Sequence, residues 1–219
     1  MEKLKRYIIF FIGLFVNSLG VSLVTKANLG TSPISSIPYV LCLNFPLTLG
    51  KFTIIFSLIL IALQLMILRK NFKPENILQI PISIVFGYFI DFTMILLSSI
   101  QPQTYFSSII YLLIGCVILG LGVYMEVLAD VAMLPGESFV RAISSTWNTD
   151  FGITKIIFDV SMTVIAGGLS LIFAHQLDRV RKGPIIVALL VLFFARLFGR
   201  LLTFLPVILF PKSTAKFPD

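Results

Sequence analysis

Charged side chains interrupt segments that are otherwise apolar enough to lie in a membrane. Asp91 falls within the apolar stretch 79–100 of the first half of the chain. A charge is costly in hydrocarbon and is kept there chiefly on ion or substrate pathways, so each such residue is a functional candidate. The candidates of the second half are Glu126, Asp130, Glu137, Lys155, Asp159, Arg196 and Arg200.

Three pairs of these residues are spaced four apart, which places both members of a pair on one face of a helix, and two of the pairs contain acidic residues. Glu126 and Asp130 stand toward the end of their apolar segment. They form either a cation or proton site, or a helix end near the membrane interface. Lys155 and Asp159 form either a structural ion pair that makes both groups tolerable in lipid, or a functional pair.

Glu137 follows a turn that contains Pro135 and Gly136. Proline suits the first position of a helix, where its missing N–H is not needed. Glu137 would then be the third residue, facing free N–H groups and the positive end of the helix dipole. The residue is therefore either a helix cap or a binding residue, with Arg141 one turn later as its candidate partner.

The first half carries a matching turn at Ser32 and Pro33, and Ser35 takes the position of Glu137. If both helix starts approach the bilayer centre, their N–H groups can hold an anion or a polar solute. Glu137 would compete with an anionic ligand. We therefore expect a cationic, zwitterionic or neutral solute at that half.

Arg196 and Arg200 share one face of the last apolar segment. They either extend to the lipid headgroups or bind an anion or an acidic partner. The two cysteines, Cys42 and Cys116, have no metal-like spacing and are interpreted as small packing residues. His175 falls in a charged loop, where we expect it to be solvated.

Composition predicts an all-α polytopic membrane protein. Hydrophobic residues make up 58% of the 219 residues and charged residues 12%, against about 45–50% and about 25% in soluble domains. The net charge of +7 is explained by basic residues near lipid headgroups, so no nucleic-acid partner is expected. Spans need about 20 apolar residues, and six segments qualify: 7–25, 52–68, 79–100, 106–129, 153–174 and 184–210.

The sequence contains an internal repeat. Residues 13–56 align with residues 115–158 at an offset of 102 without a gap, and several Gly and Pro residues match. Two shorter segments, 31–48 and 133–150, occupy equivalent places and predict re-entrant or interfacial helices. Duplication in an apolar chain indicates a pseudo-symmetric bundle, as in many transporters. The matched positions include Gly13 with Gly115, Gly20 with Gly122, Pro33 with Pro135 and Gly50 with Gly152.

These repeats divide the chain into residues 1–104, residues 105–210 and a short polar tail, 211–219. Three spans per half require that the halves be inserted in opposite directions, with the N-terminus in the cytoplasm. The repeats would instead run parallel if the short helices crossed the membrane. The inverted arrangement puts the basic loop residues Arg179, Arg181 and Lys182 outside, which the positive-inside rule disfavours.

Enzyme motifs are absent from the sequence. It contains no phosphate-binding glycine loop, no HExxH zinc motif and no G-x-S-x-G elbow. We therefore predict neither enzymatic activity nor a cofactor or metal. A membrane enzyme built on carboxylates alone is the least supported alternative.

With these motifs in place, the chain resembles the YczE/YyaS/YitT group of bacterial integral membrane proteins, in particular its YczE-like branch. The likeness departs at Leu134 and Leu192, where the pattern prefers glycine, and at Gln79 and Pro184, where threonine is usual. The resemblance implies a multi-pass protein of the bacterial inner membrane. The matching stretches are Leu19–Val21, Ala27–Pro33, Gly50, Gly87 with Asp91, Gly120–Gly122, Pro135–Glu137, Gly152 and Asp159.

We predict a small-solute transporter or facilitator with its site between the two repeats. The expected partners are the lipid bilayer, an unidentified small polar solute, and either a second copy or a partner membrane protein. The alternative is an accessory or regulatory membrane protein that does not transport. The predicted site comprises Ser32, Pro33, Ser35, Asp91, Asp130, Leu134, Gly136, Glu137, Arg141, Lys155 and Asp159.

Overall fold

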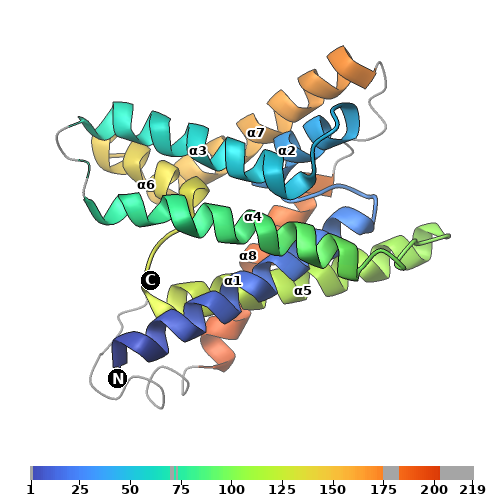
Figure 1. Ribbon diagram of the computed structural model, residues 1–219, viewed down its shortest axis with the longest axis horizontal. Coiled ribbons are helices and arrows are strands. Elements are labelled where there is room, and N and C mark those ends of the chain that lie inside the picture. Colours follow the sequence, from blue (N-terminus) through green and yellow to red (C-terminus); the bar gives the residue numbers. More distant parts are fainter. Residues whose placement is uncertain (1, 70–71, 73, 175–182, 203–219) are drawn as a thin grey trace.

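The computed structural model describes residues 2–69, 72, 74–174 and 183–202, and this part of the chain contains helices and no strand. The predicted tail 211–219 and the basic loop residues 179, 181 and 182 lie outside the described residues, as does His175. The elements are α1 (Glu2–Lys26), α2 (Pro33–Asn44), α3 (Leu49–Leu68), the 3-10 helix η2 (Pro74–Leu78), α4 (Gln79–Leu96), α5 (Tyr105–Ala129), α6 (Pro135–Trp147), α7 (Phe151–Ala174) and α8 (Gly183–Leu201) (Figure 1).

Five segments of the described chain are long and apolar enough to cross a membrane. The all-helical architecture and these segments identify a polytopic α-helical membrane protein. Helix α8 ends at Leu201, and residues 203–210 of the last predicted span are outside the described residues. The five segments are Glu2–Lys26, Leu49–Leu68, Asn76–Leu96, Tyr105–Ala129 and Phe151–Phe173.

Helices α1 and α5 pack closely and run in opposite directions. A Cβ added to Gly20 would lie 2.6 Å from the backbone nitrogen of Leu119, and one added to Gly122 would lie 2.5 Å from that of Asn17. Only glycine allows backbones to approach this closely. Since residue numbers rise along α1 while those of the contacts fall along α5, the pair is antiparallel.

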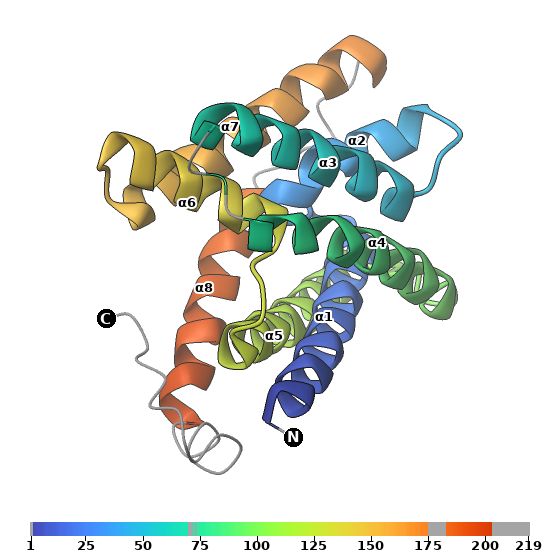
Figure 2. The same cartoon turned by 60° about the vertical axis from the view of Figure 1, so that its left-hand side comes forward.

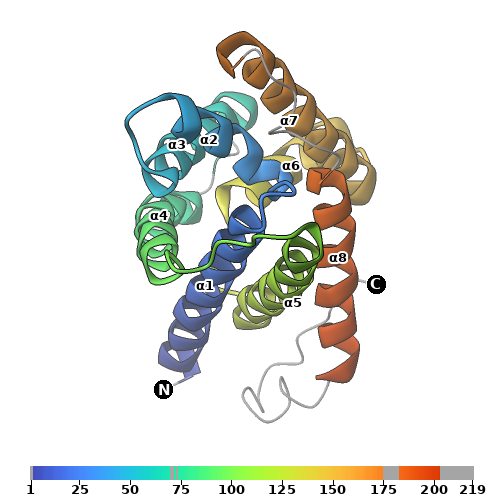
Figure 3. The same cartoon turned by 90° about the vertical axis from the view of Figure 1, so that its right-hand side faces the viewer.

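The helices form two groups joined by α4. Helices α1, α5 and α8 lie together on one side, and α2, α3, α6 and α7 lie on the other (Figures 2 and 3). Helix α4 contacts both α1 and α3. The largest buried cluster is centred on Phe10 and Leu14 of α1 and on Phe86 and Ile90 of α4. The apolar core therefore holds α4 against α1.

The two short helices begin against each other. Each has proline at its first position, Pro33 in α2 and Pro135 in α6, as predicted. A Cβ added to Gly136 would lie 2.6 Å from the Cδ1 atom of Ile34, which places the starts of the two helices in contact. At a rise of about 1.5 Å per residue, helices this short cannot cross a hydrocarbon core of about 30 Å.

Candidate functional site

A cavity of about 330 Å³ opens where the end of α5, the linker to α6, the start of α6 and the start of α4 meet. It brings together four of the charged residues that the sequence singled out, because the short linker 130–134 joins the end of α5 to the start of α6. The polar lining consists of Asn76, Gln79, Glu126, Asp130, Glu137, Ser138 and Arg141.

Glu126 is the most deeply buried acidic group of the lining. It is 7% exposed, and its Oε1 atom accepts a 2.7 Å hydrogen bond from Nδ2 of Asn17 in α1. Its second oxygen accepts no hydrogen bond from the described residues. Sequence reasoning found Glu126 but missed Asn17, because the partner lies 109 positions away.

Glu137 is the third residue of α6, as predicted, but it does not act as a hydrogen-bonded cap. The N-cap residue Leu134 has no side-chain acceptor, and within the described chain the half-buried Glu137 carboxylate takes part in no hydrogen bond. Burial raises the pKa of this carboxyl; the charge of Lys155 opposes the shift and that of Asp159 adds to it. The carboxylate is thus available to a ligand.

Two buried glutamines close the wall behind Ser138. Gln64 Nε2 donates to the Ser138 carbonyl at 3.2 Å and to its hydroxyl at 2.6 Å. Gln79 Nε2 donates to the same hydroxyl at 2.9 Å. The carboxamide oxygens of both glutamines are buried without a partner in the described structure. No local sequence pattern indicates this cluster, since each glutamine stands alone in an apolar helix.

Asp130 and Arg141 lie at the exposed mouth of the cavity. Asp130 ends α5 in the left-handed conformation, with φ 48° and ψ 45°; this agrees with the predicted helix end and does not exclude a binding role. The Arg141 guanidinium donates to Met133 Sδ at 3.4 Å. The described residues contain no ion pair between Arg141 and Glu137.

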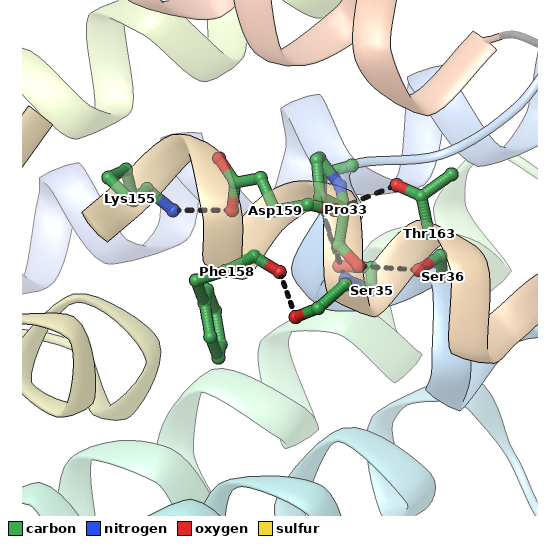
Figure 4. A network of polar contacts seen from close by, with 9 residues as sticks. Pro33, Ser35, Ser36, Lys155, Phe158, Asp159 and Thr163 are labelled. Atoms are coloured by element: carbon green, nitrogen blue, oxygen red, sulfur yellow. Dashed lines mark hydrogen bonds and ion pairs between the residues drawn. The ribbon is translucent and has the colours of Figure 1, made fainter. Parts of the chain in front are cut away.

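Lys155 and Asp159 form the ion pair that their spacing predicts, with Nζ and Oδ1 2.9 Å apart. Both side chains are largely buried in α7, next to the start of α2 (Figure 4). The Ser36 hydroxyl donates to the Met162 carbonyl at 3.4 Å, which joins the two helices. The pair does not line the cavity, but its charges act on Glu137.

The other predicted site residues, at the helix starts, contact their immediate neighbours. The Ser32 hydroxyl donates to Ser35 Oγ at 2.9 Å and accepts from the Ser35 backbone N–H at 3.4 Å. Gly136 is covered by Ile34. The starts of α2 and α6 therefore lie against each other, and Ser32, Pro33, Ser35 and Gly136 are not part of the cavity lining.

Asp91 lies elsewhere, at the start of α3. Its carboxylate accepts a 2.6 Å hydrogen bond from the Thr48 hydroxyl and a 2.8 Å bond from the Gly50 N–H. A Cβ on Gly50 would overlap the Gly87 carbonyl oxygen, so α4 contacts α3 at this point. Burial, with the Asp91 charge, raises the pKa of the Cys42 thiol to about 11. The structure does not join Asp91 to the cavity residues.

Residues 4–200 of the chain match the model of a family of unknown function, DUF6198. The chain is 31% identical over 153 residues to the uncharacterized membrane protein YczE of Bacillus subtilis (strain 168), covering 68% of this chain and 69% of that one. It is 28% identical over 183 residues to the uncharacterized protein YyaS of the same organism, covering 82% and 83%. No solved structure matches the chain.

Proposed function

The chain belongs to the DUF6198 family, together with relatives of the YczE and YyaS type, and we propose that it is a small-solute transporter or facilitator. The observation that carries the proposal is the cavity that holds Glu126 and Glu137 among membrane helices. Buried carboxylates are expensive there and are typical of substrate or proton pathways. The solute would bind between two membrane repeats.

The contacts of α1 with α5 support an inverted repeat. The pair Gly20 and Leu119 becomes Gly122 and Asn17 when each residue is exchanged for its counterpart 102 positions away. This reciprocity is what a two-fold axis between two antiparallel helices requires. The same axis explains why the starts of α2 and α6 meet at the counterpart positions Ile34 and Gly136.

A second set of contacts supports the same register. A Cβ added to Gly13 would lie 2.9 Å from Met125 Cβ, and one added to Gly115 would lie 3.2 Å from Leu23 Cβ. At the offset of 102, Gly13 corresponds to Gly115 and Leu23 corresponds to Met125. In all four contacts the partners are related by the same offset of 102, and the two helices run in opposite directions. This favours inverted over parallel insertion of the halves.

Helix α8 would be the sixth span. Gly120 of α5 is in close contact with Phe194, and the Tyr124 hydroxyl donates to the Leu202 carbonyl at 3.0 Å, so α8 runs parallel to α5. The basic residue Arg200 then lies toward the same side of the membrane as the start of α1, where Arg6 donates to the Ala129 carbonyl at 3.2 Å. An excess of basic residues on this side supports a cytoplasmic N-terminus.

The cavity would serve as the binding site in one of two alternating states. Its mouth, at Asp130, lies beside the start of α1, and Ile34 at the start of α2 contacts Gly136, next to the lining residue Glu137. Rocking one half against the other about the two-fold axis would part these helix starts and close the mouth. A solute held by Glu137 would then reach the opposite side.

Access from both sides of the membrane tests this proposal without knowledge of the solute. In a background with Cys42→Ala and Cys116→Ala, a single cysteine replaces Glu137 and is treated with a membrane-impermeant methanethiosulfonate in right-side-out and inside-out vesicles. Transport predicts labelling from both sides. Trp147→Cys, at the 60% exposed end of α6, is the control and should react from the cytoplasmic side alone.

Labelling of Glu137→Cys from one side alone would contradict the transport proposal. That result would favour an accessory or regulatory membrane protein whose buried charges are structural. A second copy or a partner membrane protein remains part of the proposal, since a chain of 24.4 kDa offers a small membrane-embedded surface for two moving halves.

A further inference from the structure

We propose that the cavity binds a small organic cation that carries at least two N–H donors, such as a primary ammonium or a guanidinium compound. The inference rests on the proposed transport function, because it names the class of solute that the same cavity would take. Three features support it: the unsatisfied acceptors of the lining, the balance of charge, and the separation of the acceptors.

The lining presents carboxylate oxygens without donors. One oxygen of Glu126 is bound by Asn17, and the other accepts no hydrogen bond within the described part of the chain, although the residue is only 7% exposed. Glu137 accepts none from that part either. A carboxylate oxygen that gives up its solvent to a ligand without donors is strongly destabilised. A ligand with several N–H groups would satisfy both carboxylates at once.

Gln79 supplies an independent sign of a polar ligand. It lines the cavity, is 3% exposed, and its carboxamide oxygen has no partner. Within the described chain no donor reaches this oxygen, and such orphaned groups require an explanation. A ligand with an N–H group would supply the missing donor.

The charges of the lining favour a cation. Among the described residues of the lining, the acidic residues Glu126, Asp130 and Glu137 stand against one basic residue, Arg141. That guanidinium is exposed and contacts Met133 rather than a carboxylate. The neighbouring cation Lys155 is held by Asp159 at 2.9 Å. Within the described chain neither basic group forms an ion pair with Glu126 or Glu137, so a bound cation would supply a direct counter-charge.

The separation of the acceptors favours an organic cation over a metal ion. No three His, Cys, Asp or Glu side chains among the described residues are close enough together to hold a metal. Metal ions need several ligands within about 2.0–2.6 Å. Acceptors spread around about 330 Å³ suit a molecule that directs N–H groups several ångströms apart, and the volume is at the lower end of small-molecule sites.

The test measures binding of defined probes to the purified full-length protein in detergent by isothermal titration and by the shift of its thermal unfolding midpoint. Methylammonium, guanidinium and agmatine are compared with tetramethylammonium, which has the charge but no N–H donor, and with potassium at equal ionic strength. We expect the N–H cations alone to bind and to raise the midpoint.

Variants of the two carboxylates identify the site. Glu126→Gln and Glu137→Gln should each weaken binding of the responding cation at least tenfold, and Glu137→Asp should restore part of it. Glu2→Gln, the same change at a partly exposed position outside the cavity, should leave binding unchanged. Thermal unfolding of each variant establishes that it is folded.

Three results would overturn the inference: equal binding of tetramethylammonium or potassium, binding of phosphate in place of the cations, or binding that survives both Glu→Gln substitutions. The cysteine-labelling test separates this failure from that of transport. Two-sided labelling without cation binding would contradict the ligand class alone. One-sided labelling with cation binding would contradict transport and leave the site in place.

Discussion

Asn17 donates a 2.7 Å hydrogen bond to the Glu126 carboxylate and thereby joins α1 to α5 at the inner end of the cavity. Both residues are more than nine-tenths buried. A polar pair in this position orients the carboxylate and also determines how the two central helices meet. Its two roles can be separated by substitution.

Asn17→Leu should lower the free energy of unfolding by about 1–3 kcal/mol, because the buried Glu126 carboxyl group loses its hydrogen-bond donor. Asn17→Leu combined with Glu126→Met should cost less than the sum of the single changes, since no buried group is then left unpaired. Unfolding in detergent, followed by circular dichroism, measures both. Strict additivity would show that the hydrogen bond does not couple the helices.

Gly122→Ala tests the close approach of α1 and α5. The new Cβ would lie 2.5 Å from the Asn17 backbone nitrogen, so the helices must separate, at a cost of about 1–3 kcal/mol. Gly167→Ala is the matched control, because nothing lies within 4 Å of its Cβ position. There, alanine should be neutral or stabilise the helix by up to about 1 kcal/mol.

Gly20→Ala extends the same test to the proposed two-fold axis. Its Cβ would meet the backbone of Leu119 as that of Gly122 meets Asn17, so the loss of stability should be of similar size. Thermal unfolding of the Gly20→Ala and Gly122→Ala variants, measured in parallel, compares them. A neutral Gly20→Ala beside a harmful Gly122→Ala would argue against equivalent contacts.

The sequence predicted features that local chemistry decides. The proline starts of α2 and α6 follow from the missing N–H of proline. The left-handed residue Asp130 at the end of α5 agrees with the predicted helix end, and Asn28, 102 positions earlier, is left-handed as well. These features depend on residues within one turn of each other, so no tertiary information is needed to find them.

The cavity depends on long-range contacts, and the sequence predicted it only in part. The charges Glu126, Asp130, Glu137 and Arg141 were candidates because charges are rare in apolar segments. Gln79 drew no attention as a site residue, since a single uncharged amide in a helix is unremarkable until its distant partner is known. The same limit applied to Asp91, which binds the start of α3 through Thr48 and Gly50, not the cavity.

Stability should fall with rising pH because of Glu137. Burial raises its pKa in the folded protein above the ordinary value of 4.5, so above that pH the folded state holds a proton that the unfolded chain has released. Stability therefore decreases as pH rises from about 4.5 through the folded pKa. The unfolding midpoint of wild type and of Glu137→Gln, measured from pH 4 to pH 9, should converge at the acidic end. A parallel pH dependence in both proteins would contradict this role of Glu137.

Lys155→Met should destabilise the protein more than the double change Lys155→Met and Asp159→Met. The single change leaves the Asp159 carboxylate largely buried without its cation, whereas the double change removes both charges. Because the side chains keep 27% and 16% exposure, we expect the single change to cost about 1–3 kcal/mol, less than for a fully buried pair.

The double change also removes the two charges that act on the Glu137 carboxyl group. If the pair is purely structural, the double variant should keep two-sided labelling at position 137; loss of labelling in a folded double variant would place the pair in the transport cycle.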